Sequence, residues 1–169
     1  VLTGFCGRAL ADETNTYMVV DLSGGAGATS YPISYLSEVP AGGWTDSYKT
    51  DKLVLRKIPR GSFTMGSPTN EVGRATGGSE DQKVVTLTND FYIGVFEITK
   101  NQYRSVAGSS EPQGMIPRDN LTKDDMNGFL SKLNSLAVPT NQNFRLPNEA
   151  QWEYACRAGS TNAYCYGSN

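Results

Sequence analysis

Apolar, β-prone residues occur in six short runs that polar or glycine-containing stretches separate, which is the pattern of short strands. Pro59-Arg60 follows the third run, a polar loop over 67–83 follows the fourth, and an Asn89-Asp90 turn precedes the sixth. Pro32 suggests that the second run lies at a sheet edge, because proline cannot donate a hydrogen bond to a neighbouring strand. The six predicted strands cover residues 16–22, 31–36, 53–58, 61–66, 84–88 and 91–96.

Three segments carry the N-terminal signature of a helix, in which a capping side chain is followed three positions later by a second polar side chain. The second side chain can accept a hydrogen bond from the backbone N–H of the capping residue. The pairs are Thr99 with Gln102, Thr122 with Asp125, and Asn148 with Gln151. Apolar side chains recur at helical spacing after Thr122, which predicts an amphipathic second helix. Its apolar face comprises Met126, Phe129, Leu130, Leu133 and Ala137.

The third predicted helix carries a tryptophan and a cysteine on one face. Trp152, Ala155, Cys156 and Gly159 share that face, so we expect Trp152 to anchor the helix against the sheet. In this interpretation the helix has a structural role in the domain and not a catalytic one. The residues predicted to have structural roles are Arg145, Asn148, Gln151, Trp152, Cys156 and Phe129, and no catalytic, cofactor-binding or metal-binding residue is predicted.

Two glutamates lie on another face of the same helix. Glu149 and Glu153 are one turn apart, and paired carboxylates are a common arrangement in acid–base catalysis. Both lie near the helix N-terminus, however, where negative charge is favourable in itself. We therefore expect a solvated or ion-paired structural role, with Arg145 or Arg157 as the partner.

Composition narrows the classes of function. The 169 residues carry a net charge of −2 with no basic stripe, which gives nucleic-acid binding little electrostatic support. No apolar run is long enough to span a membrane. The chain has no histidine, which removes Ser-His and Cys-His nucleophile pairs and the usual zinc ligand sets.

Residues 1–11 are consistent with the end of an export signal peptide. Ala9-Leu10-Ala11 has the small-x-small pattern that precedes a cleavage site, and polar residues follow it. An ordinary frayed terminus is the other interpretation. If the protein is secreted or periplasmic, Cys156 and Cys165 should be oxidised, to each other or to partners outside this chain; otherwise they are two buried thiols.

Three ordered motifs resemble the formylglycine-generating enzyme family, also called sulfatase-modifying factors. They are IPRGSFTMG over 58–66, FYIGVFEITKNQY over 91–103, and RLPNEAQWEYACRAG over 145–159, and YCYG over 164–167 stands where the family carries a Y-WG motif. The resemblance implies an irregular, loop-rich α+β fold akin to C-type lectin-like domains. It divides the chain into the signal tail, a β-rich extension over 12–52, and a partial family domain over 53–169.

The resemblance also implies what this chain lacks. Active members hold copper with a pair of cysteines and oxidise a sulfatase cysteine to formylglycine with oxygen. That pair and the calcium-binding loops belong to the part of the domain that follows the Y-WG motif. The expectation is an incomplete domain without copper or calcium, inactive by itself and marginally stable. Cys156 matches a helix position where some members carry a disulfide-bonded cysteine.

The resemblance leaves three possible functions. The first is part of an exported, sulfatase-activating oxidase, with a sulfatase or another exported protein as partner. The second is a secreted binding module on a C-type lectin-like framework, because fold alone does not fix activity. The third is a structural spacer of the cell envelope.

Overall fold

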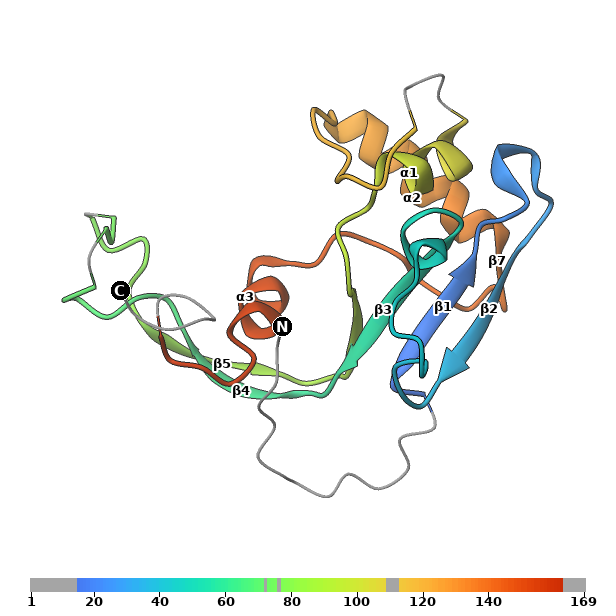
Figure 1. Cartoon of the computed structure of the whole chain (residues 1–169). Helices are drawn as coiled ribbons and strands as arrows, with labels where there is room; N and C mark the ends of the chain where they lie inside the picture. Colours follow the sequence, from blue (N-terminus) through green and yellow to red (C-terminus); the bar gives the residue numbers. More distant parts are fainter. Residues whose placement is uncertain (1–14, 72, 76, 109–112, 163–169) are drawn as a thin grey trace.

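The computed structural model describes residues 15–71, 73–75, 77–108 and 113–162. Within them, seven strands and three α-helices form a mixed α+β arrangement with a strongly curled sheet (Figure 1). This confirms the predicted fold class. None of the helices in these ranges has the length and apolar character needed to cross a membrane.

A five-stranded sheet forms the main body, with the strand order β6-β3-β1-β2-β7. At its centre β1 pairs antiparallel with β2 and with β3, so that Val19 lies opposite Ser34 on one side and Val54 on the other. Strand β6 is antiparallel to β3, and the two-residue β7, which was not predicted, is parallel to β2. The strands are β1 (Tyr17–Asp21), β2 (Tyr31–Leu36), β3 (Lys52–Ile58), β6 (Phe91–Gly94) and β7 (Ala137–Val138).

The boundary predicted between residues 52 and 53 runs through this sheet. Strands β1 and β2 come from the predicted N-terminal extension, and β3 begins the predicted family domain. Because β1 pairs with β3 along its whole length, the two segments share one layer. The division of the chain into domains stays a prediction.

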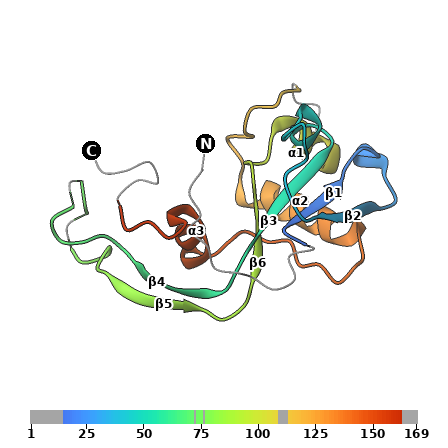
Figure 2. The same cartoon turned by 60° about the horizontal axis from the view of Figure 1, so that its bottom comes forward.

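A two-stranded ribbon, β4 (Gly61–Met65) with β5 (Lys83–Leu87), continues the β3–β6 pair beyond a bend. Ile58 lies opposite Phe91 before the bend, and Gly61 lies opposite Leu87 after it. Asp90 fixes the bend, since its carboxylate accepts a hydrogen bond from the Arg60 N–H at 3.0 Å and pairs with Lys57 at 3.3 Å. Figure 2 shows the ribbon extending away from the main sheet.

All three predicted helix starts are confirmed. The helices are α1 (Lys100–Ala107), α2 (Lys123–Leu136) and α3 (Glu149–Arg157). Each has a complete capping box, with Thr99, Thr122 and Asn148 as the N-caps. The Asn148 side chain accepts from the Gln151 N–H at 2.8 Å, and Gln151 accepts from the Asn148 N–H at 3.2 Å.

Helices α1 and α2 pack together and cover one face of the sheet (Figure 1). Phe129 of α2 is only 6% exposed and stacks on Tyr103 of α1, with ring centroids 5.6 Å apart. On the other face Trp44 packs edge-on against Tyr17 and Tyr48. The main core comprises Val20, Leu22, Tyr31, Leu53, Tyr103, Val106, Phe129 and Leu133.

Candidate functional site

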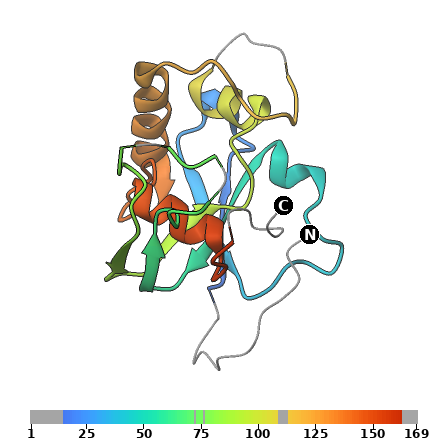
Figure 3. The same cartoon turned by 90° about the vertical axis from the view of Figure 1, so that its left-hand side faces the viewer.

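Helix α3 lies over the β4–β5 ribbon, apart from α1 and α2 (Figure 3). Its polar side chains attach it to the end of β4. The carboxylate of Glu153 accepts a hydrogen bond from the Gly66 N–H at 2.8 Å, and the guanidinium of Arg157 donates to the Gly66 carbonyl at 2.8 Å. Glu153 and Arg157 also pair with each other at 2.7 Å. The expected ion pair of this helix therefore forms with Arg157.

Gly66 is required where this attachment is made. Its φ of +96° lies in the region that side chains rarely adopt, and an added Cβ would come within 2.7 Å of the Glu80 and Asp81 carbonyl oxygens. Beside it, the ring of Tyr154 packs against Phe63 of β4 with centroids 5.2 Å apart. Charged hydrogen bonds and an aromatic contact thus fix the orientation of α3.

That orientation contradicts the prediction that Trp152 anchors the helix. Trp152 is 58% exposed, because the docked side of α3 is the one that carries Glu153, Tyr154 and Arg157. Trp152 is two residues before Tyr154, about 200° away around the helix. The apolar pattern alone selected the wrong face, since hydrogen bonds to Gly66 and the Tyr154 ring decide how this helix docks.

Cys156 is also exposed, and its thiol is free. The structure therefore does not bury the side chain at this position, and the pairing of Cys156 stays a prediction. Cys6 and Cys165, like the YCYG motif, lie outside the described residues. Arg145, the other predicted ion-pair partner, is exposed, and its guanidinium donates to the Leu146 carbonyl at 3.4 Å.

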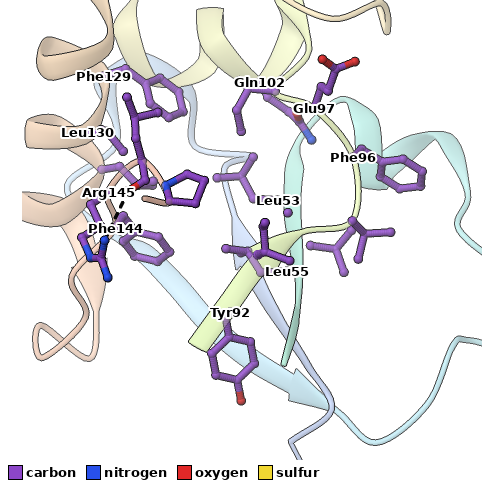
Figure 4. A pocket seen from close by; sticks show the side chains of 18 of the residues that line it. Leu53, Leu55, Tyr92, Phe96, Glu97, Gln102, Phe129, Leu130, Phe144 and Arg145 are labelled. Carbon is purple, nitrogen blue, oxygen red and sulfur yellow. Dashed lines mark hydrogen bonds between the residues drawn. The ribbon is translucent and has the colours of Figure 1, made fainter. Parts of the chain in front are cut away.

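A cleft of about 730 Å³ opens between the sheet, α2 and the segment that leads into α3 (Figure 4). Strand β6 and the neighbouring β3 form one wall, and α2 forms another. Leu53, Leu55, Phe129 and Phe144 gather around the same space in Figure 4, so the cleft continues the main core outwards. Trp152 and the 55% exposed Leu146 also line it.

Asn134 of α2 positions the segment that leads into α3. Its side-chain amide donates to the Phe144 carbonyl at 2.8 Å and accepts from the Phe144 N–H at 2.7 Å. The single side chain thus pairs with both backbone polar groups of Phe144, as a neighbouring strand would. Sequence reasoning missed this residue, because a polar side chain in mid-helix carries no signal of its partner.

The cleft lining is mainly apolar. The described residues that line it include three charged side chains, Glu97, Arg118 and Arg145, and no cysteine, serine, threonine or lysine. Burial raises the pKa of the Tyr92 phenol, whose hydroxyl donates to the Asn15 carbonyl at 2.8 Å. The lining therefore offers no activated nucleophile with an adjacent base.

The described residues do not fit a copper site of two thiolates. Cys156 is the single cysteine among them, and no group of three or more metal-ligating side chains comes together in the ranges that the structure covers. No catalytic step through copper can be placed on these residues.

Comparison with known proteins identifies the family to which this chain belongs. The family model described as a sulfatase-modifying factor enzyme 1-like domain, FGE-sulfatase, matches residues 44–169. The chain belongs to this FGE-sulfatase family. The match begins just before the 3-10 helix η2 (Asp46–Lys49). It takes in strands β3 to β7 and all three α-helices.

A solved structure supports the family relationship of this FGE-sulfatase chain. The structure of PvdO from Pseudomonas aeruginosa matches with a TM-score of 0.54 and 25% sequence identity. The match covers 66% of this chain and 49% of the PvdO chain, so the chain corresponds to about half the length of PvdO. The search of curated proteins gave no match.

Proposed function

We propose that this chain is the framework part of an FGE-family domain whose complete form oxidises a sulfatase cysteine to formylglycine. The family match over residues 44–169 carries the proposal. The conversion turns a side-chain CH₂SH into an aldehyde and releases the sulfur as H₂S. Oxygen is the oxidant, and its reduction to water needs two further electrons, which the oxidation of two thiols to a disulfide can supply.

The geometry of α3 supports the assignment of a framework role. The carboxylate of Glu153 accepts hydrogen bonds from the Gly66 N–H and from the Arg157 guanidinium. It therefore holds the helix on the ribbon and does not face the cleft as a free base. The cleft lining has the apolar character of an interior surface. We therefore assign the copper pair, the calcium sites and the sulfatase-binding loops to a part of the domain beyond the described residues.

The proposed setting is the cell exterior or the periplasm, as the pattern of residues 1–11 suggests. The partner is a sulfatase polypeptide presented to the complete domain. A secreted, non-catalytic binding module is the second candidate function. It is favoured by the large apolar cleft, because the described residues of its lining offer no activated nucleophile with an adjacent base.

An aldehyde assay tests the proposed function. The chain is incubated with a sulfatase-motif peptide, Cu(I), oxygen and a thiol reductant, and the peptide mass and its reaction with an aminooxy probe are followed. We expect no aldehyde from the 169-residue chain, and aldehyde when the downstream part of the same reading frame is joined to it. Aldehyde from the chain alone would overturn the framework assignment, and none from the joined protein would favour a binding module.

A further inference from the structure

The five-stranded sheet combines strands from inside and outside the family match. Strands β6, β3 and β7 lie within residues 44–169, whereas β1 and β2 precede residue 44. The order β6-β3-β1-β2-β7 places the β1–β2 hairpin between β3 and β7. Within the described residues, these family-matched strands therefore belong to one sheet only through a hairpin that the family model does not match.

Strand β1 has the character of a central strand. Residues 17–20 are all buried, and none is more than 8% exposed. Val20 belongs to the cluster that includes residues of α1 and α2, and Val19 belongs to the cluster on the other face of the sheet. An apolar run that is buried on both faces is typical of a strand inside a layered domain. A loosely attached extension would leave one face open to water.

Both sides of β1 carry backbone hydrogen bonds. The strand pairs with β3 along its whole length and with β2 over residues 17–20. The bonds to the β3 segment continue past both ends, since the Lys57 N–H donates to the Thr16 carbonyl at 2.8 Å and the Leu22 N–H donates to the Asp51 carbonyl at 2.7 Å. Unpairing β1 would leave two rows of backbone groups without partners, which costs free energy wherever they stay buried.

Side-chain hydrogen bonds also join the N-terminal segment to the helices. The hydroxyl of the fully buried Tyr31, at the start of β2, lies 3.1 Å from the Ser105 carbonyl of α1 and 3.0 Å from the Gly25 carbonyl, and it can donate to either. From α2, the Lys132 ammonium donates to the Ala26 carbonyl at 2.7 Å. The segment before residue 44 thus contacts both helices that cover the sheet.

We propose that residues 15–43 are an obligatory part of the family domain in this protein, which folds and unfolds with the β1–β2 hairpin as one unit. The shared core provides the coupling, because removal of Val20, Leu22 and Tyr31 would leave a cavity beside Phe129 and Leu133. Neither the boundary predicted between residues 52 and 53 nor the start of the family match at residue 44 is then a folding boundary. This inference does not depend on the proposed oxidase function.

Native-state hydrogen exchange of the 169-residue chain, in low concentrations of urea, tests the proposal. The reporters are the backbone amides of Val20 in β1, Val106 in α1 and Leu133 in α2, all of them buried residues. If the domain opens as one unit, their protection factors should agree within about fivefold and fall with the same dependence on urea. A Val20 protection factor that is lower by more than this would reveal a separable hairpin and overturn the proposal.

A conservative variant tests whether the coupling reaches α2. Tyr31→Phe removes only a buried hydroxyl, and it should speed exchange of the Val20 and Leu133 amides alike, by about fivefold. Leu133 is the decisive reporter, because the Tyr31 hydroxyl bonds to α1 and not to α2. Tyr35→Phe is the matched control, since Tyr35 is 37% exposed on the same strand, and both rates should be unchanged. Faster exchange at Val20 alone would contradict the coupling.

The exchange measurements need neither copper nor a sulfatase peptide. A chain that opens as one unit, but whose joined form yields no aldehyde in the assay, would support this inference while contradicting the proposed oxidase function. Separate opening of the hairpin together with aldehyde formation would do the reverse. The two proposals therefore fail independently.

Discussion

Glu153 and Arg157 lie one turn apart on α3 and pair at 2.7 Å while both hold Gly66, the carboxylate through its N–H and the guanidinium through its carbonyl. Their side chains are 20% and 17% exposed, respectively, so the group is largely removed from water. Charged hydrogen bonds of this kind are stronger than neutral ones. The pair therefore sets the position of α3, and with it the position of Trp152 at the cleft.

Glu153→Ala should lower the free energy of unfolding by about 2–3 kcal/mol, because it removes a charged hydrogen bond and leaves Arg157 without its carboxylate. Urea denaturation measures the loss. Glu149→Ala is the matched control, since Glu149 is exposed in the first turn of the same helix, and it should cost no more than about 1 kcal/mol. Equal losses for the two variants would show that the Gly66 contacts do not hold the helix.

Asn134→Ala should lower the free energy of unfolding by about 2 kcal/mol, because both backbone groups of Phe144 lose their partner. Amide exchange at Phe144 should accelerate at the same time. Asn127→Ala on the exposed side of α2 provides the control and should change stability by less than about 0.5 kcal/mol. Unaltered exchange at Phe144 would indicate that other contacts fix the cleft wall.

Local signals predicted much of this fold. Thr99, Thr122 and Asn148 each mark the start of a helix, because the capping box is a contact between residues three apart and is complete in the sequence. The six predicted strands are all present within a residue or two of their expected limits, since β-prone runs with turn residues between them depend on local preferences. Phe129 is buried, and it belongs to an apolar stripe that is visible in the sequence.

Contacts between distant segments were not predictable from the same patterns. The pairing of β7 with β2 joins residues about a hundred positions apart, and nothing in the Ala137-Val138 dipeptide indicates it. The Asn89-Asp90 segment was expected as a turn, whereas it bends two continuous strand pairs. The error at Trp152 has the same origin, because Gly66 lies 87 residues before Glu153 and selects the docked face of α3.

Asp90 should make the stability of the protein depend on pH in the acid range. The hydrogen bond from the Arg60 N–H holds the pKa of Asp90 below its ordinary value of 3.8, and the neighbouring Lys57 also lowers this pKa, to a smaller extent. The ionised carboxylate therefore stabilises the fold above pH 3.8, and this contribution is lost as the pH falls through the lower pKa of the folded state. The effect should be small, because the side chain is 43% exposed.

Melting temperatures of the protein and of Asp90→Asn, measured from pH 6 down to pH 2, provide the test. The variant should lose less stability over the acid part of this range, so the two curves should converge as the pH falls. Parallel curves would show that the carboxylate of Asp90 has the same pKa in the folded and unfolded states.

The fluorescence of Trp152 tests most directly whether α3 is a scaffold helix with its tryptophan facing an open cleft. Trp44→Phe leaves Trp152 as the single tryptophan and keeps an aromatic ring between Tyr17 and Tyr48. We predict emission at the long wavelength of a hydrated indole and quenching by acrylamide nearly as efficient as that of free tryptophan. Blue-shifted emission that acrylamide barely quenches would place the indole in the core and contradict the account.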